Sequence, residues 1–121
     1  MFAIYDLMRH IKSECEIHTF GLGKVMSAGV LLLAAGTKGK RKVGKNTRLM
    51  LHSIQGGHFG SLSSLENEVE EARWLQTRMI EALVSETKLT KRQVQKMLDK
   101  KVDFYIDADE AIKFGIADTI I

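Results

Sequence analysis

The spacing of apolar residues along the first third of the chain predicts a helix, a strand and a second helix. Residues 2–11 have apolar side chains at intervals of three and four, which is the pattern of an amphipathic helix. Residues 16–20 alternate polar and apolar side chains, as a half-buried strand does, and glycines follow them. Residues 26–35 are apolar on every side, so they predict a buried helix with Gly36 as its stop signal.

One long helical stripe dominates the middle of the chain. Residues 48–52 are a short, mostly apolar strand that leads into a glycine-rich stretch at 56–60. Ser63 and Glu66 then have the spacing of a capping box, and an apolar stripe follows over about six turns. The stripe consists of Leu65, Val69, Ala72, Leu75, Met79 and Leu83. A helix of this length can project from a body and pack against a neighbour.

Shorter elements complete the chain and indicate the fold class. Thr90 and Gln93 have the spacing that starts a helix. Asp107 and Glu110 cap a further helix, which Gly115 ends, and the chain then returns as a final strand. Helices that alternate with short apolar strands are typical of an α/β protein.

The composition is that of one average globular domain. The chain has 121 residues, of which 45% are hydrophobic and 27% charged, and its formal net charge is +3. Residues 38–42 and Lys45 form a basic run that could contact nucleic acid or a membrane surface. We interpret it as a solvated turn, because no aromatic side chains interleave with the charges. We therefore expect neither a nucleic-acid nor a membrane partner.

The cysteine pattern and the absence of a long apolar run predict a soluble, cytoplasmic protein. Cys15 is the single cysteine, so an internal disulfide cannot form, which suits a reducing compartment. It lies among acidic residues that oppose a thiolate, and we interpret it as structural. The longest apolar run, residues 30–35, is far too short to span a bilayer, and the first residues lack the pattern of a leader peptide.

Ser27 is the candidate nucleophile. It lies where a glycine-bounded turn enters the buried helix, so the N–H groups of Ala28 and Gly29 are free to donate. The helix dipole favours negative charge that develops nearby. Serine is a weak nucleophile unless a base takes its proton. From this local context alone, an ordinary serine that caps the helix is the alternative.

His52 and Asp103 are the candidate base and its partner. His52 ends a strand, where a side chain is held firmly and stays accessible, although a partly buried structural histidine is the alternative. Asp103 opens the apolar patch at 104–106, where a partly hydrated carboxylate needs a partner such as an imidazole. The other histidines and aspartates have poorer settings. Asp107 is better explained as a helix cap, and Asp118 is expected to be solvated.

Other chemistries do not fit the spacing. Residues 25–29 lack the first glycine of the G-x-S-x-G elbow of α/β-hydrolases. The chain has no Walker A loop and no G-x-G-x-x-G motif, and no group of histidine, cysteine and aspartate has the spacing of a zinc site. We therefore expect no metal and no cofactor.

Taken together, these segments resemble the proteolytic subunits of the Clp (caseinolytic) protease family. The sequence G-K-V-M-S-A-G at 23–29 is similar to the family's nucleophile segment, usually G-Q-A-A-S-M-G. Five segments match in order: residues 3–12, 23–29, 33–41, 48–57 and 103–118. Each motif is weak alone, but five in register make the match specific, and it covers essentially the whole chain.

The resemblance implies a fold and an assembly. The fold would be crotonase-like, with stacked βαβ units in one partial domain over 1–121 and a handle-like segment at about 55–87. Gly56 and Gly57 would lie on a strand that pairs with extended substrate backbone. The subunits would form rings of seven stacked in pairs, and a Clp-type AAA+ ATPase would feed them polypeptide substrates.

The resemblance also implies an activity, that of a serine endopeptidase working through an acyl-enzyme. Ser27 would be the nucleophile, His52 the base and Asp103 the residue that orients the imidazole. The Ala28 N–H would be one oxyanion donor.

Departures from the family pattern leave two alternatives open. The family's N-terminal portion has no counterpart before Met1, so the resemblance predicts a divergent, N-terminally truncated member. Ile54 replaces a proline two positions after the histidine, and residues 24–26 replace smaller or neutral side chains beside the nucleophile. One alternative is a catalytically impaired subunit that acts as an oligomer-forming interaction protein. The other is an acyl-CoA enzyme of the crotonase superfamily.

Overall fold

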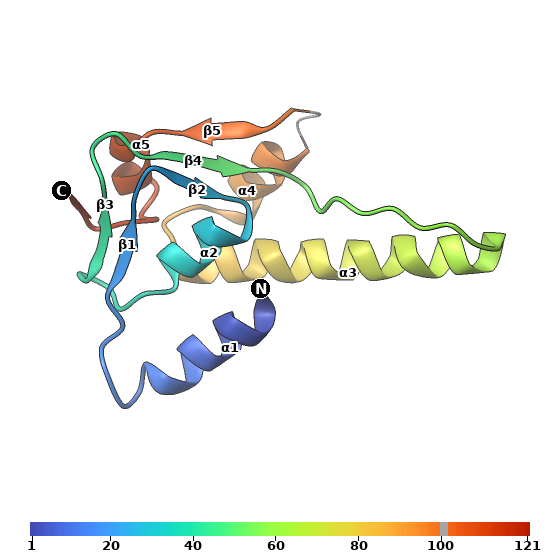
Figure 1. Ribbon diagram of the computed structural model, residues 1–121, viewed down its shortest axis with the longest axis horizontal. Helices are drawn as coiled ribbons and strands as arrows, with labels where there is room; N and C mark the ends of the chain where they lie inside the picture. Colours follow the sequence, from blue (N-terminus) through green and yellow to red (C-terminus); the bar gives the residue numbers. More distant parts are fainter. Residues whose placement is uncertain (100–101) are drawn as a thin grey trace.

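The structure is a computed structural model that describes residues 1–99 and 102–121 (Figure 1). Two small sheets and several helices form a body, and one long helix projects from it. The elements in chain order are α1 (Phe2–Ile11), β1 (Thr19–Gly21), β2 (Lys24–Met26), α2 (Ala28–Ala34), β3 (Arg41–Val43), β4 (Arg48–Leu51), α3 (Leu62–Glu86), α4 (Lys91–Leu98), β5 (Phe104–Ile106), α5 (Ala108–Lys113) and β6 (Thr119–Ile120).

The described strands form two three-stranded sheets. One sheet has the order β1-β3-β6, and all its strands are parallel. The other has the order β2-β4-β5, in which β2 and β4 are parallel and β5 is antiparallel to β4. Strands β1 to β4 thus alternate between the two sheets, β5 joins the sheet of β4, and α2 connects β2 to β3. This arrangement confirms the predicted α/β class and agrees with a crotonase-like fold of stacked βαβ units.

The helix α2 forms the centre of the core. It contacts β1, β2, β4 and α3, so it fills the space between the sheets and the long helix (Figure 1). Its buried residues are Val30, Leu31, Leu33 and Ala34. The helix is enclosed on most sides, which agrees with its apolar sequence, while Gly29 and Leu32 are half-buried. It begins at Ala28 rather than at Met26, because residues 24–26 belong to β2.

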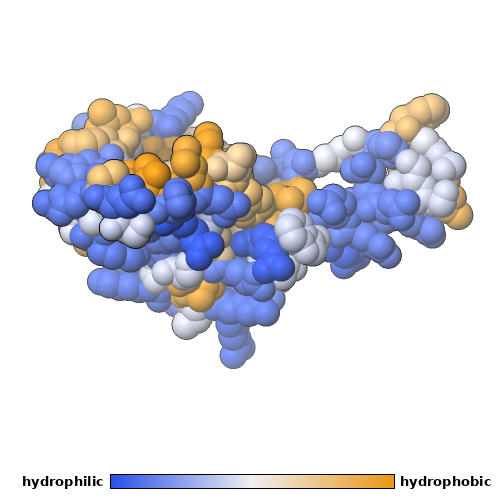
Figure 2. All heavy atoms as spheres, turned by 90° about the horizontal axis from the view of Figure 1, so that it is seen from below, coloured by the Kyte–Doolittle hydropathy of each residue, from blue (hydrophilic) through white to orange (hydrophobic). Residues whose placement is uncertain are grey.

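The long helix α3 packs against the body with its second half only. It has 25 residues, which makes it about 37 Å long. Met79 and Leu83 are buried, whereas Leu65 and Val69 are 38% and 52% exposed. The first half of α3 therefore extends away from the body as an arm (Figures 1 and 2), with residues 52–61 running beside it (Figure 1). The predicted projecting helix is confirmed.

Two of the three helix N-caps predicted from the sequence are correct. The N-cap of α3 is Ser61, whose hydroxyl accepts a hydrogen bond from the Ser64 N–H at 3.3 Å. The predicted cap at Ser63 is therefore wrong by two positions. The capping boxes that begin at Thr90 and Asp107 are both present, so these two predictions are confirmed.

The basic run contains a buried arginine, so its interpretation as a solvated turn is wrong at this residue. Arg41 lies in β3 and is 3% exposed. Its guanidinium donates to the Asp118 carboxylate at 2.6 and 2.8 Å, and to the backbone oxygens of Ala34 and Glu86 at 3.1 and 2.8 Å. These hydrogen bonds lower the pKa of Asp118 to about 2, so the expectation of a solvated Asp118 is also wrong.

A second buried ionic group joins α1 to the end of α3. Glu86 is 6% exposed, and its carboxylate accepts hydrogen bonds from the Tyr5 hydroxyl at 3.1 Å and from Lys12 at 3.2 Å. The Lys38 ammonium lies 3.8 Å from the same carboxylate. Burial raises the pKa of Tyr5, and the charge of Glu86 acts in the same direction. We call Tyr5, Lys12, Lys38 and Glu86 the Glu86 cluster.

Candidate active site

Ser27 occupies a strained turn between β2 and α2. Its backbone has φ 52° and ψ −117°, and it is the one non-glycine residue with positive φ in the described part of the chain. Its side chain makes no hydrogen bond to the helix that it precedes. Such strain is costly for a residue with a Cβ and tends to occur at functional sites.

The sheet holds this turn in place. Met26 is paired in parallel register with Met50, and the next N–H, that of Ser27, donates to the Met50 carbonyl at 2.7 Å. The strand β2 therefore ends at a fixed point, and the chain turns directly into α2. Sequence reasoning missed β2, because three residues are too few to show an alternation. It consequently missed that Ser27 lies on a strand-to-helix turn.

His52 and Asp103 lie at the same end of this sheet as Ser27. His52 directly follows β4, and Asp103 directly precedes β5. The antiparallel register pairs Leu51 with Phe104, so His52 and Asp103 are each one residue beyond that pair. Because β2 runs parallel to β4, Ser27 leaves the sheet at this end too. The topology thus brings the three backbone positions together at the end of three adjacent strands.

The three side chains do not form a hydrogen-bonded relay in the part of the chain that the structure describes. The His52 ring is half-buried, and its Nδ1 atom lies 2.5 Å from the Ser53 carbonyl oxygen. Asp103 is exposed, so the expectation of a partly hydrated carboxylate at this position is wrong. A relay would need the imidazole to turn from the Ser53 carbonyl toward the Asp103 carboxylate.

Ala28 is the first residue of α2. The first N–H groups of a helix have no acceptor within the helix, so the N–H of Ala28 remains able to donate to a ligand. The helix that it opens is short and buried, and the Val30 N–H returns to the Ser27 carbonyl at 3.1 Å. The N–H of Ala28 is thus attached to the same rigid turn as the candidate nucleophile.

Gly56 and Gly57 lie in an exposed segment without regular structure. Residues 52–61 form no strand, although the resemblance implies one here. The space around both glycines is open, with no atom within 4 Å of the position of an added Cβ. A hydrogen bond from the Ile54 N–H to the Gln76 side-chain oxygen at 2.9 Å attaches the backbone of this segment to α3. Gln76 was not identified from the sequence as a contact of this segment. Its position as a polar residue next to the apolar stripe of α3 was the one signal that could have indicated it.

A mainly apolar depression borders the serine turn. It has a volume of about 550 Å³ and reaches the turn through Met26 and Gly29. Ile4, Phe20 and Leu22 line it and are 54%, 55% and 63% exposed. The strands β1 and β2, which also contribute, are edge strands of their sheets. We refer to this surface as the apolar depression.

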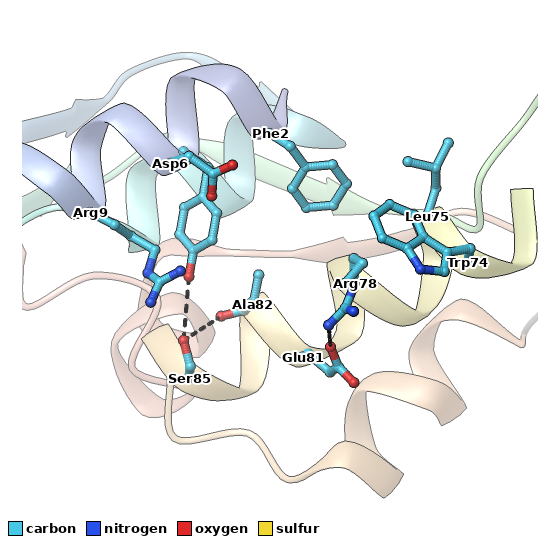
Figure 3. Close-up of a pocket in the computed structure, with 10 residues that line it drawn as sticks. Phe2, Asp6, Arg9, Trp74, Leu75, Arg78, Glu81, Ala82 and Ser85 are labelled. Carbon is cyan, nitrogen blue, oxygen red and sulfur yellow. Dashed lines mark hydrogen bonds and ion pairs between the residues drawn. The ribbon is translucent and has the colours of Figure 1, made fainter. Parts of the chain in front are cut away.

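A separate groove of about 610 Å³ lies between α1 and α3 (Figure 3). Arg78 forms an ion pair with Glu81 at 2.9 Å along its α3 wall. The Tyr5 hydroxyl lies 3.4 Å from that of Ser85, which donates to a carbonyl of its own helix. None of the three predicted catalytic residues lines this groove, so it is distinct from the candidate active site.

Two features that the described residues, 1–99 and 102–121, lack bear on other functions. No group of three or more histidine, cysteine, aspartate and glutamate side chains is arranged to hold a metal ion. No helix in the same part of the chain is both long enough and apolar enough to cross a membrane.

The fold and the serine turn together define a class of protein. The body is α/β, and its candidate nucleophile lies on a strained turn from a strand into a buried helix, which is typical of a hydrolytic enzyme with a serine nucleophile. The family model described as Clp protease matches residues 1–121. The chain therefore belongs to the Clp protease family, and the resemblance stated from its motifs is confirmed.

Curated relatives agree with this assignment. The chain is 34% identical over 120 residues to "ATP-dependent Clp protease proteolytic subunit 2" of Chlamydia pneumoniae, with 98% of the chain and 57% of that protein covered. It is 36% identical over 118 residues to the protein of the same name from Synechococcus sp. (strain CC9605), with 98% and 58% covered. It is 33% identical over 120 residues to "ATP-dependent Clp protease proteolytic subunit 1" of Chlamydia felis, with 98% and 57% covered. The chain thus spans somewhat more than half the length of these relatives.

Proposed function

We propose that the chain is a serine endopeptidase subunit of an ATP-dependent Clp-type protease. Ser27 is the nucleophile, His52 the general base and Asp103 the residue that orients the imidazole. The observation that carries the proposal is the strained backbone of Ser27 at the start of α2, at the sheet end shared by the histidine and aspartate segments. Membership of the Clp protease family supports the same reading.

The chemistry is acyl transfer. The Ser27 hydroxyl attacks the carbonyl carbon of a peptide bond while His52 takes its proton, and the resulting oxyanion accepts a hydrogen bond from the Ala28 N–H. His52 then returns the proton to the leaving amine, which leaves an acyl-enzyme that water hydrolyses. Asp103 stabilises the imidazolium that forms in each step.

The proposal includes partners and a location. The chain forms homo-oligomers, with rings of seven stacked in pairs, and the α3 arm contributes to the contact between rings. A Clp-type AAA+ ATPase delivers unfolded polypeptides, and their extended backbone binds beside Gly56 and Gly57. The assembly works in the cytoplasm. The support is the family membership, the projecting arm and the free backbone of the glycine-rich segment.

A fluorophosphonate probe tests the proposed nucleophile directly. The wild-type chain is expected to be labelled at Ser27, and peptide cleavage should fall by at least about 10⁴-fold in Ser27→Ala. Ser63→Ala is a suitable control, because Ser63 is an exposed serine on the arm. Cleavage that persists in Ser27→Ala would exclude Ser27 as the nucleophile.

One observation favours a second candidate function, that of a catalytically impaired subunit in an oligomer. The His52 ring faces the Ser53 carbonyl, and the Asp103 carboxylate is exposed to solvent. A chain in which these groups never align would still present its arm to other subunits. Assembly into oligomers without any labelling of Ser27 would select this second function over the first.

A further inference from the structure

The hydrogen bond between Ile54 and Gln76 lies at a critical point of the chain. Ile54 follows the proposed base, His52, by two residues, and it precedes the exposed glycine pair. Its N–H donates to the side-chain oxygen of Gln76 at 2.9 Å. Both residues are half-buried, so water competes only partly for this hydrogen bond.

No other hydrogen bond in the described part of the chain ties the backbone of residues 52–60 to another element. The ladder between β4 and β5 ends at the pair of Leu51 and Phe104. The other side-chain hydrogen bond from this segment to α3 joins His58 to Ser64, near the far end of the arm. Just beyond Leu51 one backbone hydrogen bond to α3 therefore holds the chain, beside the packing of the Ile54 side chain against the hydrophobic core.

The base needs this support because its own ring contacts are local. The nitrogen Nδ1 of His52 faces the carbonyl of Ser53, which belongs to the same short backbone stretch. If that stretch moves, the ring moves with it, and a displacement of about 1 Å can cost on the order of 10²-fold in rate. The position of the Ile54 backbone therefore controls the position of the imidazole.

We infer that Gln76 is a positioning residue, which fixes the backbone after β4 and thereby holds His52 where it can serve Ser27. Gln76 acts through the backbone and touches neither the nucleophile nor the base. The inference rests on the proposed peptidase function.

The N–H of the isoleucine at position 54 gives Gln76 its task. Proline has a fixed φ and no N–H, so it stiffens a backbone without needing an acceptor. Isoleucine leaves the backbone freer and exposes an N–H, which must find a partner in a half-buried place. The Gln76 side chain supplies that partner and restores the restraint. Residues 54 and 76 therefore act as one unit.

The experiment measures the labelling of Ser27 by a fluorophosphonate in the full chain, as a rate constant and as a final labelled fraction. Gln76→Leu removes the acceptor, and we expect its rate constant to fall about tenfold while the final fraction stays complete. Gln76→Glu keeps an acceptor oxygen and should stay within about threefold of the wild type. Gln95→Leu, the same change at an exposed position of α4, is the matched control and should have no effect.

Ile54→Pro completes the test as a double-mutant cycle. In this background there is no N–H to satisfy, so adding Gln76→Leu should not slow labelling further. Two results would overturn the inference when the wild type is labelled. In the first, Gln76→Leu is labelled at the same rate as the wild type. In the second, Gln76→Leu slows labelling equally in the Ile54 and Ile54→Pro backgrounds. A lower final fraction with an unchanged rate constant would also overturn it, because it would show a purely structural role.

The outcomes separate the inference from the proposal beneath it. A wild type that is never labelled overturns the peptidase function and, with it, the positioning role. A labelled wild type with insensitive Gln76 variants overturns the positioning role alone.

Discussion

Ser27 has an unfavourable backbone conformation, and its side chain makes no capping hydrogen bond that would stabilise the fold. Its positive φ costs on the order of 1–3 kcal/mol for a residue with a Cβ. A serine before a helix normally offsets such costs with a capping hydrogen bond, but Ser27 makes none. Stability alone would favour glycine here, which supports the proposed role of the serine hydroxyl.

Ser27→Gly is therefore expected to raise the free energy of unfolding by about 1 kcal/mol, because glycine adopts positive φ without strain. The same variant should lose all probe labelling. Ser27→Ala keeps the strained Cβ and should stay within about 0.5 kcal/mol of the wild type. Urea denaturation of the three proteins measures the differences. A glycine variant less stable than the alanine variant would contradict the strain.

Asp118 gives the fold a defined pH dependence. Its pKa falls from 3.8 to about 2 on folding, so its contribution to stability is present above about pH 4 and is lost as the pH falls toward 2. The shift corresponds to about 2 kcal/mol. Asp118→Asn should be less stable than the wild type by about this amount at pH 7, and the difference should shrink between pH 4 and 2. Unfolding curves across this range test it; a constant difference would refute the role of this carboxylate.

At the scale of elements, the sequence predicts those parts that have many regularly spaced residues or a local cap. The amphipathic pattern of residues 2–11 and the capping boxes at Thr90 and Asp107 are all found in the structure. The three-residue strands β2, β3 and β5 were not predictable, because their pairing partners are distant in the sequence. The burial of Arg41 follows from the pairing of β3 with its neighbours, so it could not be predicted from the sequence either.

The candidate site shows the same division. The residue types and the segments around Ser27, His52 and Asp103 could be identified from the sequence. The positive φ of Ser27, the direction of the His52 ring and the exposure of Asp103 depend on the sheet that gathers these segments. The contact between Ile54 and Gln76 joins a loop to a helix 22 residues away, which no local pattern reveals.

Gly115, which ends α5, and Gly39 allow a matched test of what an added Cβ costs at a glycine with positive φ. Gly115 has φ 70°, and a Cβ there would lie 3.0 Å from the backbone nitrogen of Lys88. Gly39 has φ 85° but has open space around it. Gly39→Ala should cost about 1 kcal/mol for the left-handed backbone alone, and Gly115→Ala should cost at least about 2 kcal/mol because it adds a clash. Thermal unfolding measures both; equal costs would show that the clash is relieved.

At the scale of the whole molecule, the apolar depression is a hydrophobic part of the exposed surface. Exposed apolar side chains there adjoin the free edges of β1 and β2, and both features favour association with other chains. The body therefore has a hydrophobic face beside its candidate active site.

We expect the isolated chain to bind the dye ANS and to self-associate at micromolar concentration. The double variant Ile4→Lys and Leu22→Lys should reduce both effects several-fold, because it puts charges into the depression. Leu62→Lys, at an exposed leucine on the arm, is the control and should change dye binding little. Dye fluorescence and sedimentation velocity supply the measurements. Unchanged dye binding in the double variant would exclude the depression as the surface that binds the dye.

The Glu86 cluster determines how the arm can move. Glu86 is the last residue of α3, and its carboxylate is held by Tyr5 and Lys12 while its carbonyl accepts hydrogen bonds from Lys38 and Arg41. A pivot at this point would break all these bonds at once. Bending costs less free energy along the first turns of α3, which do not pack against the body. We therefore expect α3 to adjust its position by bending along its length, while its C-terminal end stays fixed to the body.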